Sequence, residues 1–306
     1  MALPSSGTLS LGDIAANQGA NSVGVVTPYS LYQLCTLTGV GTYYDGAWFR
    51  DYYVSNFYSW PGYGYKFGSP AMLHDFGLST RFPTSSSAII DTSGNARNGT
   101  FVTGTGNGTA TNVTGYTTGY PGNIAINSAS QYSIRLNDVA KFAGTASYTV
   151  ISWVKVTSFP SSYPGIVGAE GRSGSTPIGW SMHFDNVGAY RLTHTRWDGT
   201  SGNSITVSVT FGSGGAPSFA TGTWYMVIAR WTGSLIIVSL CANGSRYNST
   251  SGGSSSLSTS ASYSAFIGLR YNNWLNGNIG YTAIYESSLS DAQIDEIYEL
   301  TRYRYA

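Results

Sequence analysis

Beyond residue 85, hydrophobic and polar positions alternate along short segments that are separated by Gly, Asn and Ser. The alternation is clearest in 180–184, 190–195 and 204–209, and a period of two is typical of antiparallel strands with one buried face. Residues 148–156 instead carry apolar side chains at adjacent positions, which indicates a central strand buried on both faces. The pattern therefore predicts an all-β sandwich or jelly roll.

Two further patterns in this region predict a hairpin and a helix. Residues 224–231 and 235–240 are strand-like and flank Thr232-Gly-Ser234, a gap of hairpin length. Near the C-terminus, Ser290-Asp-Ala-Gln293 forms a capping box, and the isoleucines that follow share one face. This arrangement predicts a short helix whose apolar face is turned inward.

The first 84 residues have a different pattern. Residues 10–19 and 27–34 carry helix-start signals, but helices of this length need a surface to dock on. Residues 41–80 mix glycine with many aromatic residues. Because glycine fills no core volume, this mixture favours flat contact surfaces.

Two interpretations of the aromatic segment are open: a hairpin packed on the sandwich, or an oligomer or docking interface. Together with the helical arm, the interface interpretation involves Leu11, Ile14, Trp48, Phe49, Tyr52, Tyr53, Phe57, Tyr58 and Trp60.

Charge and cysteine content exclude several classes of function. Only 9% of the 306 residues are charged and the net charge is +1, so the chain has no basic stripe for nucleic acid. Cys35 and Cys241 fall in different parts of the chain, which favours free thiols over a disulfide.

The N-terminal residues lack a charged region followed by an apolar run, so no secretory signal is expected. No apolar run is long enough to span a bilayer.

The sequence contains no recognisable catalytic constellation. Glycoside hydrolysis needs two carboxylates that face one bond, but the glutamates form no Glu-x-Asp-x-Glu arrangement. Glu170 is expected in a Gly-rich loop without a near partner. No Gly-x-Ser-x-Gly elbow or phosphate loop is found. We therefore predict that the protein is not an enzyme.

Two histidines are the remaining candidates for a metal site. His183 and His194 fall on adjacent predicted strands, but no third ligand accompanies them. Two half-buried strand histidines are the favoured interpretation, and no metal site is predicted.

Two motifs in the first half of the predicted sandwich resemble a known family. The segment Asp91-Thr-Ser-Gly-Asn-Ala-Arg-Asn-Gly-Thr100 resembles the first-strand motif of laminin-G-like, concanavalin A-like domains. Residues 125–132, followed by 148–155, are similar to the next two strands of that family.

Two later motifs extend the resemblance to about Tyr298. Residues 224–235 resemble the family's Trp-Tyr-His-Val hairpin, with Met226 at the position of the histidine, where the side chain normally serves packing. Residues 275–294 resemble the closing strand and cap. The resemblance implies that residues 85–306 form a concanavalin A-like, laminin-G-like antiparallel β-sandwich jelly roll.

Sugar-binding sandwiches of this kind stack loop aromatic residues on sugar rings and bind hydroxyl groups with Asn and Asp. The best candidates in this chain are Trp197, Asp198, Tyr271, Asn272 and Trp274. The alternative for each aromatic residue is a ring that covers the edge of the sandwich. Family members often bind Ca²⁺ through loop Asp residues, but the sequence offers no convincing ligand set, and no cofactor is predicted.

A second, shorter resemblance lies at the N-terminus. Residues Leu3 to Ile14 are similar to the opening of many bacteriophage virion proteins. This implies that residues 1–84 are an anchoring arm with an attachment segment, which binds other virion proteins, and that 85–306 project from the particle surface.

The combined prediction is a tail fibre or a capsid fibre or decoration protein that contacts host surface glycan. By analogy with such appendages we expect a homo-oligomer, with a trimer favoured. Two alternatives are a purely structural capsid cement and a free carbohydrate-binding lectin-like module.

Overall fold

The computed structural model describes part of the 306-residue chain. The described residues are 70–76, 88–93, 95–104, 108–109, 116–117, 123–126, 129–136, 146–159, 163–173, 176–198, 204–253 and 263–305. The chain divides into two compact units, Met1–Trp60 and Pro61–Ala306. Every described residue belongs to the second unit. The predicted interface residues Leu11, Ile14, Trp48, Phe49, Tyr52, Tyr53, Phe57, Tyr58 and Trp60 lie outside the described residues.

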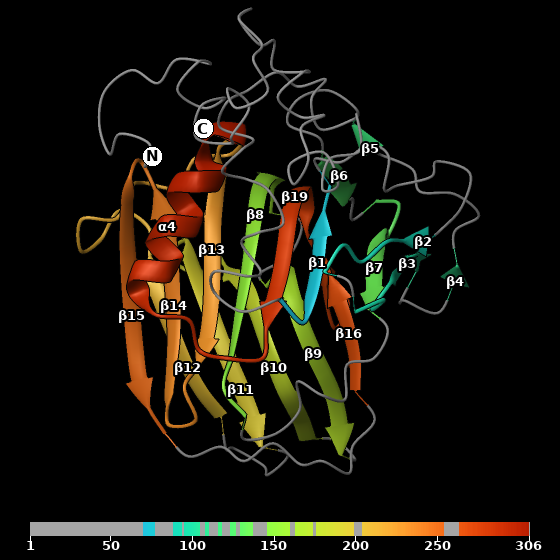
Figure 1. Ribbon diagram of the computed structural model, residues 1–306, viewed down its shortest axis with the longest axis horizontal. Coiled ribbons are helices and arrows are strands. Elements are labelled where there is room, and N and C mark those ends of the chain that lie inside the picture. Colours follow the sequence, from blue (N-terminus) through green and yellow to red (C-terminus); the bar gives the residue numbers. More distant parts are fainter. Residues whose placement is uncertain are drawn as a thin grey trace, which may run out of the picture. The chain divides into compact units, whose positions relative to one another are not determined.

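Two antiparallel sheets pack face to face (Figure 1). The sheet nearer the viewer, which we call the front sheet, has the order β15-β14-β13-β8-β19-β6-β5, and β1 also pairs with β19. Its strands are β1 (Met72–Asp75), β5 (Tyr116–Thr117), β6 (Asn123–Ile126), β8 (Tyr148–Ser158), β13 (Trp224–Trp231), β14 (Leu235–Ala242), β15 (Ser245–Gly252) and β19 (Asn276–Tyr285).

The second sheet, which we call the back sheet, has the order β12-β11-β10-β9-β16-β7-β3-β2, with β4 paired to β3. Its strands are β2 (Ala88–Ile89), β3 (Gly99–Thr103), β4 (Gly108–Thr109), β7 (Ser133–Leu136), β9 (Gly165–Ser173), β10 (Thr176–Asp185), β11 (Arg191–Asp198), β12 (Ser204–Thr210) and β16 (Tyr263–Ile267). A small hairpin, β17 (Leu269–Arg270) with β18 (Asn273–Trp274), forms a separate two-stranded sheet. The predicted all-β antiparallel sandwich is therefore confirmed.

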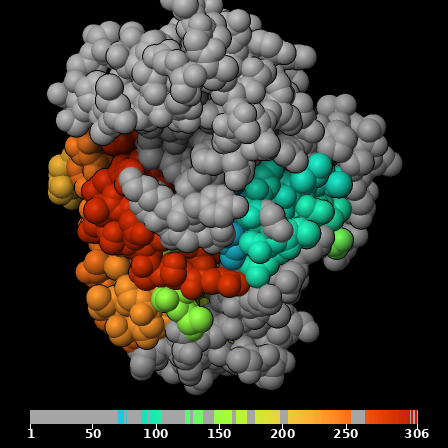
Figure 2. Space-filling view, viewed as in Figure 1, coloured from blue at the N-terminus to red at the C-terminus, as the bar shows by residue number. Residues whose placement is uncertain are grey.

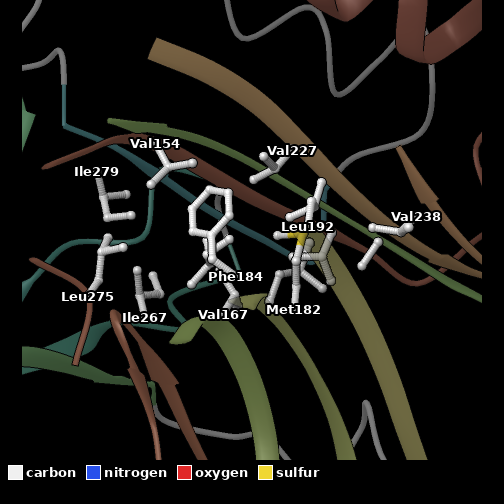
Figure 3. Close-up of a cluster of buried hydrophobic side chains, with 14 of the residues drawn as sticks. Val154, Val167, Met182, Phe184, Leu192, Val227, Val238, Ile267, Leu275 and Ile279 are labelled. Carbon is white, nitrogen blue, oxygen red and sulfur yellow. The ribbon is translucent and has the colours of Figure 1, made fainter. Parts of the chain in front are cut away.

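Alternation along the strands creates the core between the sheets. Figure 3 shows aliphatic, methionine and phenylalanine side chains from both sheets meeting there. The front sheet contributes Val154, Val227, Val238 and Ile279, and the back sheet contributes Val167, Met182, Phe184, Leu192 and Ile267. Each side chain of this size stabilises the fold by about 1.5–3 kcal/mol when it is fully buried. β8 is buried from Tyr148 through Val154, as its continuous apolar pattern predicts.

Helix α4 (Asp291–Thr301) covers the outer face of the front sheet. Ser290 and Gln293 form the predicted capping box, and Ile294 and Ile297 are buried against that sheet. The indole of Trp153 donates a hydrogen bond of 2.8 Å to Thr301 Oγ1. The red C-terminal residues therefore form much of the coloured surface on the side shown in Figure 2. Of the described helices, none is long and apolar enough to cross a membrane.

The first-strand motif folds around one carboxylate. Asp91 accepts hydrogen bonds from the backbone N–H groups of Leu73, Ser93 and Arg97 and from the Ser93 hydroxyl, at 2.8–2.9 Å. These bonds lower the pKa of Asp91 below its ordinary value, although burial opposes them. The motif therefore has a structural role, because the Asp91 side chain connects β1 to the loop before β3 through hydrogen bonds.

β1 lies N-terminal to residue 85, where the sandwich was predicted to begin. It extends the front sheet by pairing with β19, and Met72 and Phe76 are buried in the main core. The front sheet therefore includes residues that precede the predicted boundary, while the anchoring role of residues 1–84 stays a prediction.

Candidate functional site

The outer face of the back sheet presents polar side chains beside aromatic ones. On β10, alternation directs Trp180, Met182 and Phe184 into the core, so the intervening residues face outward. In the pairing with β11, Ser181 lies opposite Thr195 and His183 lies opposite Thr193, so these β11 residues face outward as well. The outward set on the two strands is Ser181, His183, Asp185, Arg191, Thr193, Thr195 and Trp197. All of these except Arg191 and Trp197 are buried.

The β17–β18 hairpin crosses this outer face. The chain leaves β16 through Gly268, whose φ of 83° suits glycine, and turns back at Tyr271, whose φ is 51°. The hairpin passes so close to β9 that a Cβ at Gly165 would lie 2.3 Å from the backbone nitrogen of Arg270. Glycine at position 165 therefore permits the hairpin to lie against the sheet.

Arg270 is the centre of the resulting cluster. Its guanidinium carbon lies 5.5 Å from the ring centroid of Tyr163, 5.3 Å from that of Trp197 and 5.4 Å from that of Tyr271. Its Nε lies 3.3 Å from Glu170 Oε1 and donates a hydrogen bond of 3.2 Å to Ser181 Oγ. We call these six residues the Arg270 cluster. Cation–π contacts and the ion pair hold the guanidinium in one position.

Glu170 differs from its predicted setting. It was expected in a Gly-rich loop without a near partner, but it lies on β9 and forms an ion pair with Arg270. β9 is a strand despite its glycines, and the glycine at position 165 leaves room for the hairpin to approach it closely. Burial raises the pKa of Glu170 to about 7, against the lowering effects of Arg270, Ser181 and the Tyr271 backbone.

The two histidines lie on adjacent strands, as predicted, but on opposite faces of the sheet. His183 faces outward, opposite Thr193, while His194 faces the core, opposite Met182. Both are fully buried rather than half-buried, and burial lowers the pKa of each. They cannot share one metal ion, and within the described part of the chain no group of three His, Cys, Asp or Glu residues could hold one.

A protein-family model described as the concanavalin A-like lectin/glucanases superfamily matches residues 127–295. This match spans more than half of the chain. The chain belongs to this superfamily. No curated protein matches the sequence.

Solved structures share the fold of this concanavalin A-like chain at low identity. Domain 4 of AbnA, a GH43 extracellular arabinanase from Geobacillus stearothermophilus, solved in complex with arabinotriose, is 18% identical, with a TM-score of 0.51 over 75% of this chain and 98% of that domain. The binding domain of botulinum neurotoxin DC in complex with SialylT is 14% identical, with a TM-score of 0.52 over 76% of this chain and 51% of that one. The botulinum neurotoxin serotype G binding domain is 13% identical, with a TM-score of 0.53 over 76% of this chain and 51% of that one.

The structure brings part of the predicted sugar-binding set of this concanavalin A-like domain together. Trp197 lies near the end of β11, and its ring meets that of Tyr271 edge-to-face at 6.4 Å. Asn272 is exposed at the hairpin tip beside Tyr271. Trp274 is only 8% exposed. Asp198 ends β11, and its side chain lies outside the described part of the structure.

Sequence reasoning missed four members of the Arg270 cluster. Tyr163 is 39% exposed, Arg270 and Glu170 form the ion pair, and Ser181 accepts a hydrogen bond from Arg270. Arg270 directly precedes Tyr271, and that adjacency was the available signal. The other three come from segments that only the strand pairing of the back sheet and the hairpin bring close.

Proposed function

We propose that this concanavalin A-like domain is a non-enzymatic glycan-binding module whose ligand site is the Arg270 cluster. The observation that carries the proposal is the convergence of three aromatic rings on one fixed guanidinium at the outer face of the back sheet. Aromatic faces contact the C–H groups of a sugar ring. The guanidinium and the exposed amide of Asn272 supply donors for its hydroxyl groups.

Two solved structures with this fold support the ligand class. The arabinanase domain was solved with arabinotriose, and the neurotoxin binding domain with SialylT. Glu170 and Asp185 do not make a pair of hydrolytic carboxylates in this arrangement, because each is held by a different arginine. Hydrolysis of a glycosidic bond needs two carboxylates that face that bond, so binding without cleavage is the activity that these residues favour.

We further propose that the domain is carried on a bacteriophage particle, as part of a tail fibre or a capsid fibre or decoration protein. The motivation is the virion-like segment from Leu3 to Ile14 and the aromatic stretch that follows it. In this proposal residues 1–84 attach to other virion proteins, a trimer is the expected assembly, and the sandwich is exposed at the particle surface to contact host glycan.

Binding is tested with a panel that contains arabinotriose, a sialylated trisaccharide and neutral oligosaccharides. Trp197→Ala and Tyr271→Ala should each weaken binding by about tenfold, since each removes one stacking face. Trp224→Ala is the matched control, because Trp224 is a partly exposed ring on the front sheet. Binding that survives both substitutions, or no binding to any glycan, would contradict the proposed site.

The attachment role is tested separately on particles. A chain that begins at Pro61 keeps the whole compact unit that contains the sandwich. We expect this chain to fold and to fail to incorporate into virions. Incorporation at the level of the full chain would contradict the anchoring role of the N-terminal segment.

A further inference from the structure

The guanidinium of Arg270 has one edge that no described residue uses. Its Nε donates a hydrogen bond of 3.2 Å to Ser181 Oγ and lies 3.3 Å from Glu170 Oε1. Within the described part of the chain, the terminal nitrogens Nη1 and Nη2 have no hydrogen-bond acceptor, and neither of them is fully buried. The protein therefore holds the inner nitrogen and leaves the two outer nitrogens as donors to a ligand.

The charge on this outer edge is only weakly compensated. Of the described carboxylates, only that of Glu170 contacts Arg270, and it lies beside Nε rather than beside the terminal nitrogens. His183 lies close by, but burial holds its pKa well below the ordinary value, so its ring is neutral near pH 7. The remaining neighbours of the guanidinium are the three uncharged rings. The outer edge therefore presents positive charge.

Glu170 is itself only partly ionised near neutral pH, because burial raises its pKa to about 7. On its β16 side the paired residue is Ser264, which carries no charge. The polar or titratable groups that surround it from the other packed elements are Arg270 and the Tyr271 backbone N–H in the hairpin, Ser181 with its bonded neighbour His183 on β10, and Tyr163 before β9. None of these groups adds a second negative charge.

We propose that the Arg270 cluster selects a sugar that carries a carboxylate group, such as a uronic or sialic acid, and that Nη1 and Nη2 of Arg270 bind this carboxylate. The inference deepens the proposed function and rests on it. A planar guanidinium edge matches a planar carboxylate with two parallel, charge-assisted hydrogen bonds. A neutral sugar offers hydroxyl groups, which supply neither the charge nor the paired oxygen atoms.

Glu170 acts as an internal competitor for the same cation. When it is ionised, it attracts Arg270 and repels the carboxylate of the ligand, and both effects vanish when it is protonated. Lowering the pH from 8 to 6 converts Glu170 from mostly charged to mostly neutral. A sugar carboxylate stays ionised over this range. An acidic sugar should therefore bind more tightly at the lower pH, whereas a neutral sugar lacks the charge that Glu170 repels.

The test is calorimetric titration of the full chain with matched sugars, sialyllactose against lactose and trigalacturonate against galactotriose. At pH 6 we expect at least one acidic sugar to bind about tenfold more tightly than its neutral match. This preference should fall by about three- to tenfold at pH 8, as Glu170 ionises. Arg270→Gln should abolish the preference. Arg191→Gln is the matched control and should retain it, because Arg191 pairs with Asp185 at the other end of β11.

Glu170→Gln keeps the test decisive if Arg270→Gln disturbs the hairpin. Glutamine does not ionise, so the acidic-to-neutral ratio of this variant should be the same at pH 8 as at pH 6. Equal affinities within both pairs, or a preference that survives Arg270→Gln, would overturn the inference while glycan binding itself stands. Tighter binding of lactose sulfate than of sialyllactose would overturn the carboxylate assignment. Failure of every sugar to bind would instead contradict the proposed function, and the inference with it.

Discussion

Two buried carboxylates of this sandwich, Asp91 and Glu170, are expected to respond to pH in opposite ways. Asp91 and Glu170 are both largely buried, yet their pKa values move in opposite directions. Four donated hydrogen bonds stabilise the charged form of Asp91. Burial beneath the β17–β18 hairpin disfavours the charged form of Glu170, and one ion pair only partly compensates.

Asp91→Ala should lower the free energy of unfolding by roughly 2–4 kcal/mol, because it leaves several backbone N–H groups without an acceptor. Since the folded-state pKa of Asp91 is depressed, its contribution is present above the ordinary pKa of aspartate and is lost as the pH falls below it. Urea unfolding of both chains at pH 7 and pH 3 measures this. Equal stability losses at the two pH values would contradict the role of the charged form.

Glu170→Gln tests the opposite case. The folded-state pKa is raised from 4.5 to about 7, so the folded state binds the proton more tightly than the unfolded chain. The free energy of unfolding of the parent protein should therefore fall as the pH rises from about 5 to 7. The glutamine variant should lack this decrease, as measured by chemical unfolding across that range. An unchanged pH dependence would mean that Glu170 titrates normally.

At the scale of elements, the β17–β18 hairpin creates the Arg270 cluster. It reaches the sheet only because position 165 has no side chain. Gly165→Ala should destabilise the protein by about 1–3 kcal/mol and weaken glycan binding, since the hairpin must shift. Gly252→Ala is the control, because its new Cβ would meet only the Leu235 side chain at 4.0 Å. Similar effects of the two substitutions, by thermal unfolding and glycan titration, would contradict this account.

The strands and α4 could be predicted from sequence because their signals are local. Period-two alternation, the Thr232-Gly-Ser234 turn and the Ser290–Gln293 capping box each act within a few residues. The cluster could be predicted only in part. Trp197 and Tyr271 stood out as aromatic residues, but no local pattern signals that Glu170 meets Arg270 across 100 positions of the chain. Trp274 is an aromatic residue of the same short segment as Tyr271, so the sequence did not distinguish the two. The pleat of β18 nevertheless turns the Trp274 side chain into a buried position.

For the whole molecule, the boundary of the sandwich has a measurable consequence. β1 pairs with β19 and places Met72 and Phe76 in the core. A chain of residues 61–306 should therefore match the free energy of unfolding of the sandwich in the full chain, whereas residues 85–306 should be less stable by several kcal/mol. Chemical unfolding of the two fragments measures this difference. Equal stability would mean that β1 contributes little to the sheet.

The central claim is that a concanavalin A-like domain binds glycan on the outer face of its back sheet. The most direct measurement is a crystal structure of the full chain saturated with the oligosaccharide that binds best in the panel. We predict a sugar ring stacked on Trp197 or Tyr271, with hydroxyl groups that accept hydrogen bonds from Arg270. A saturated complex in which the Arg270 cluster holds no sugar would contradict the account.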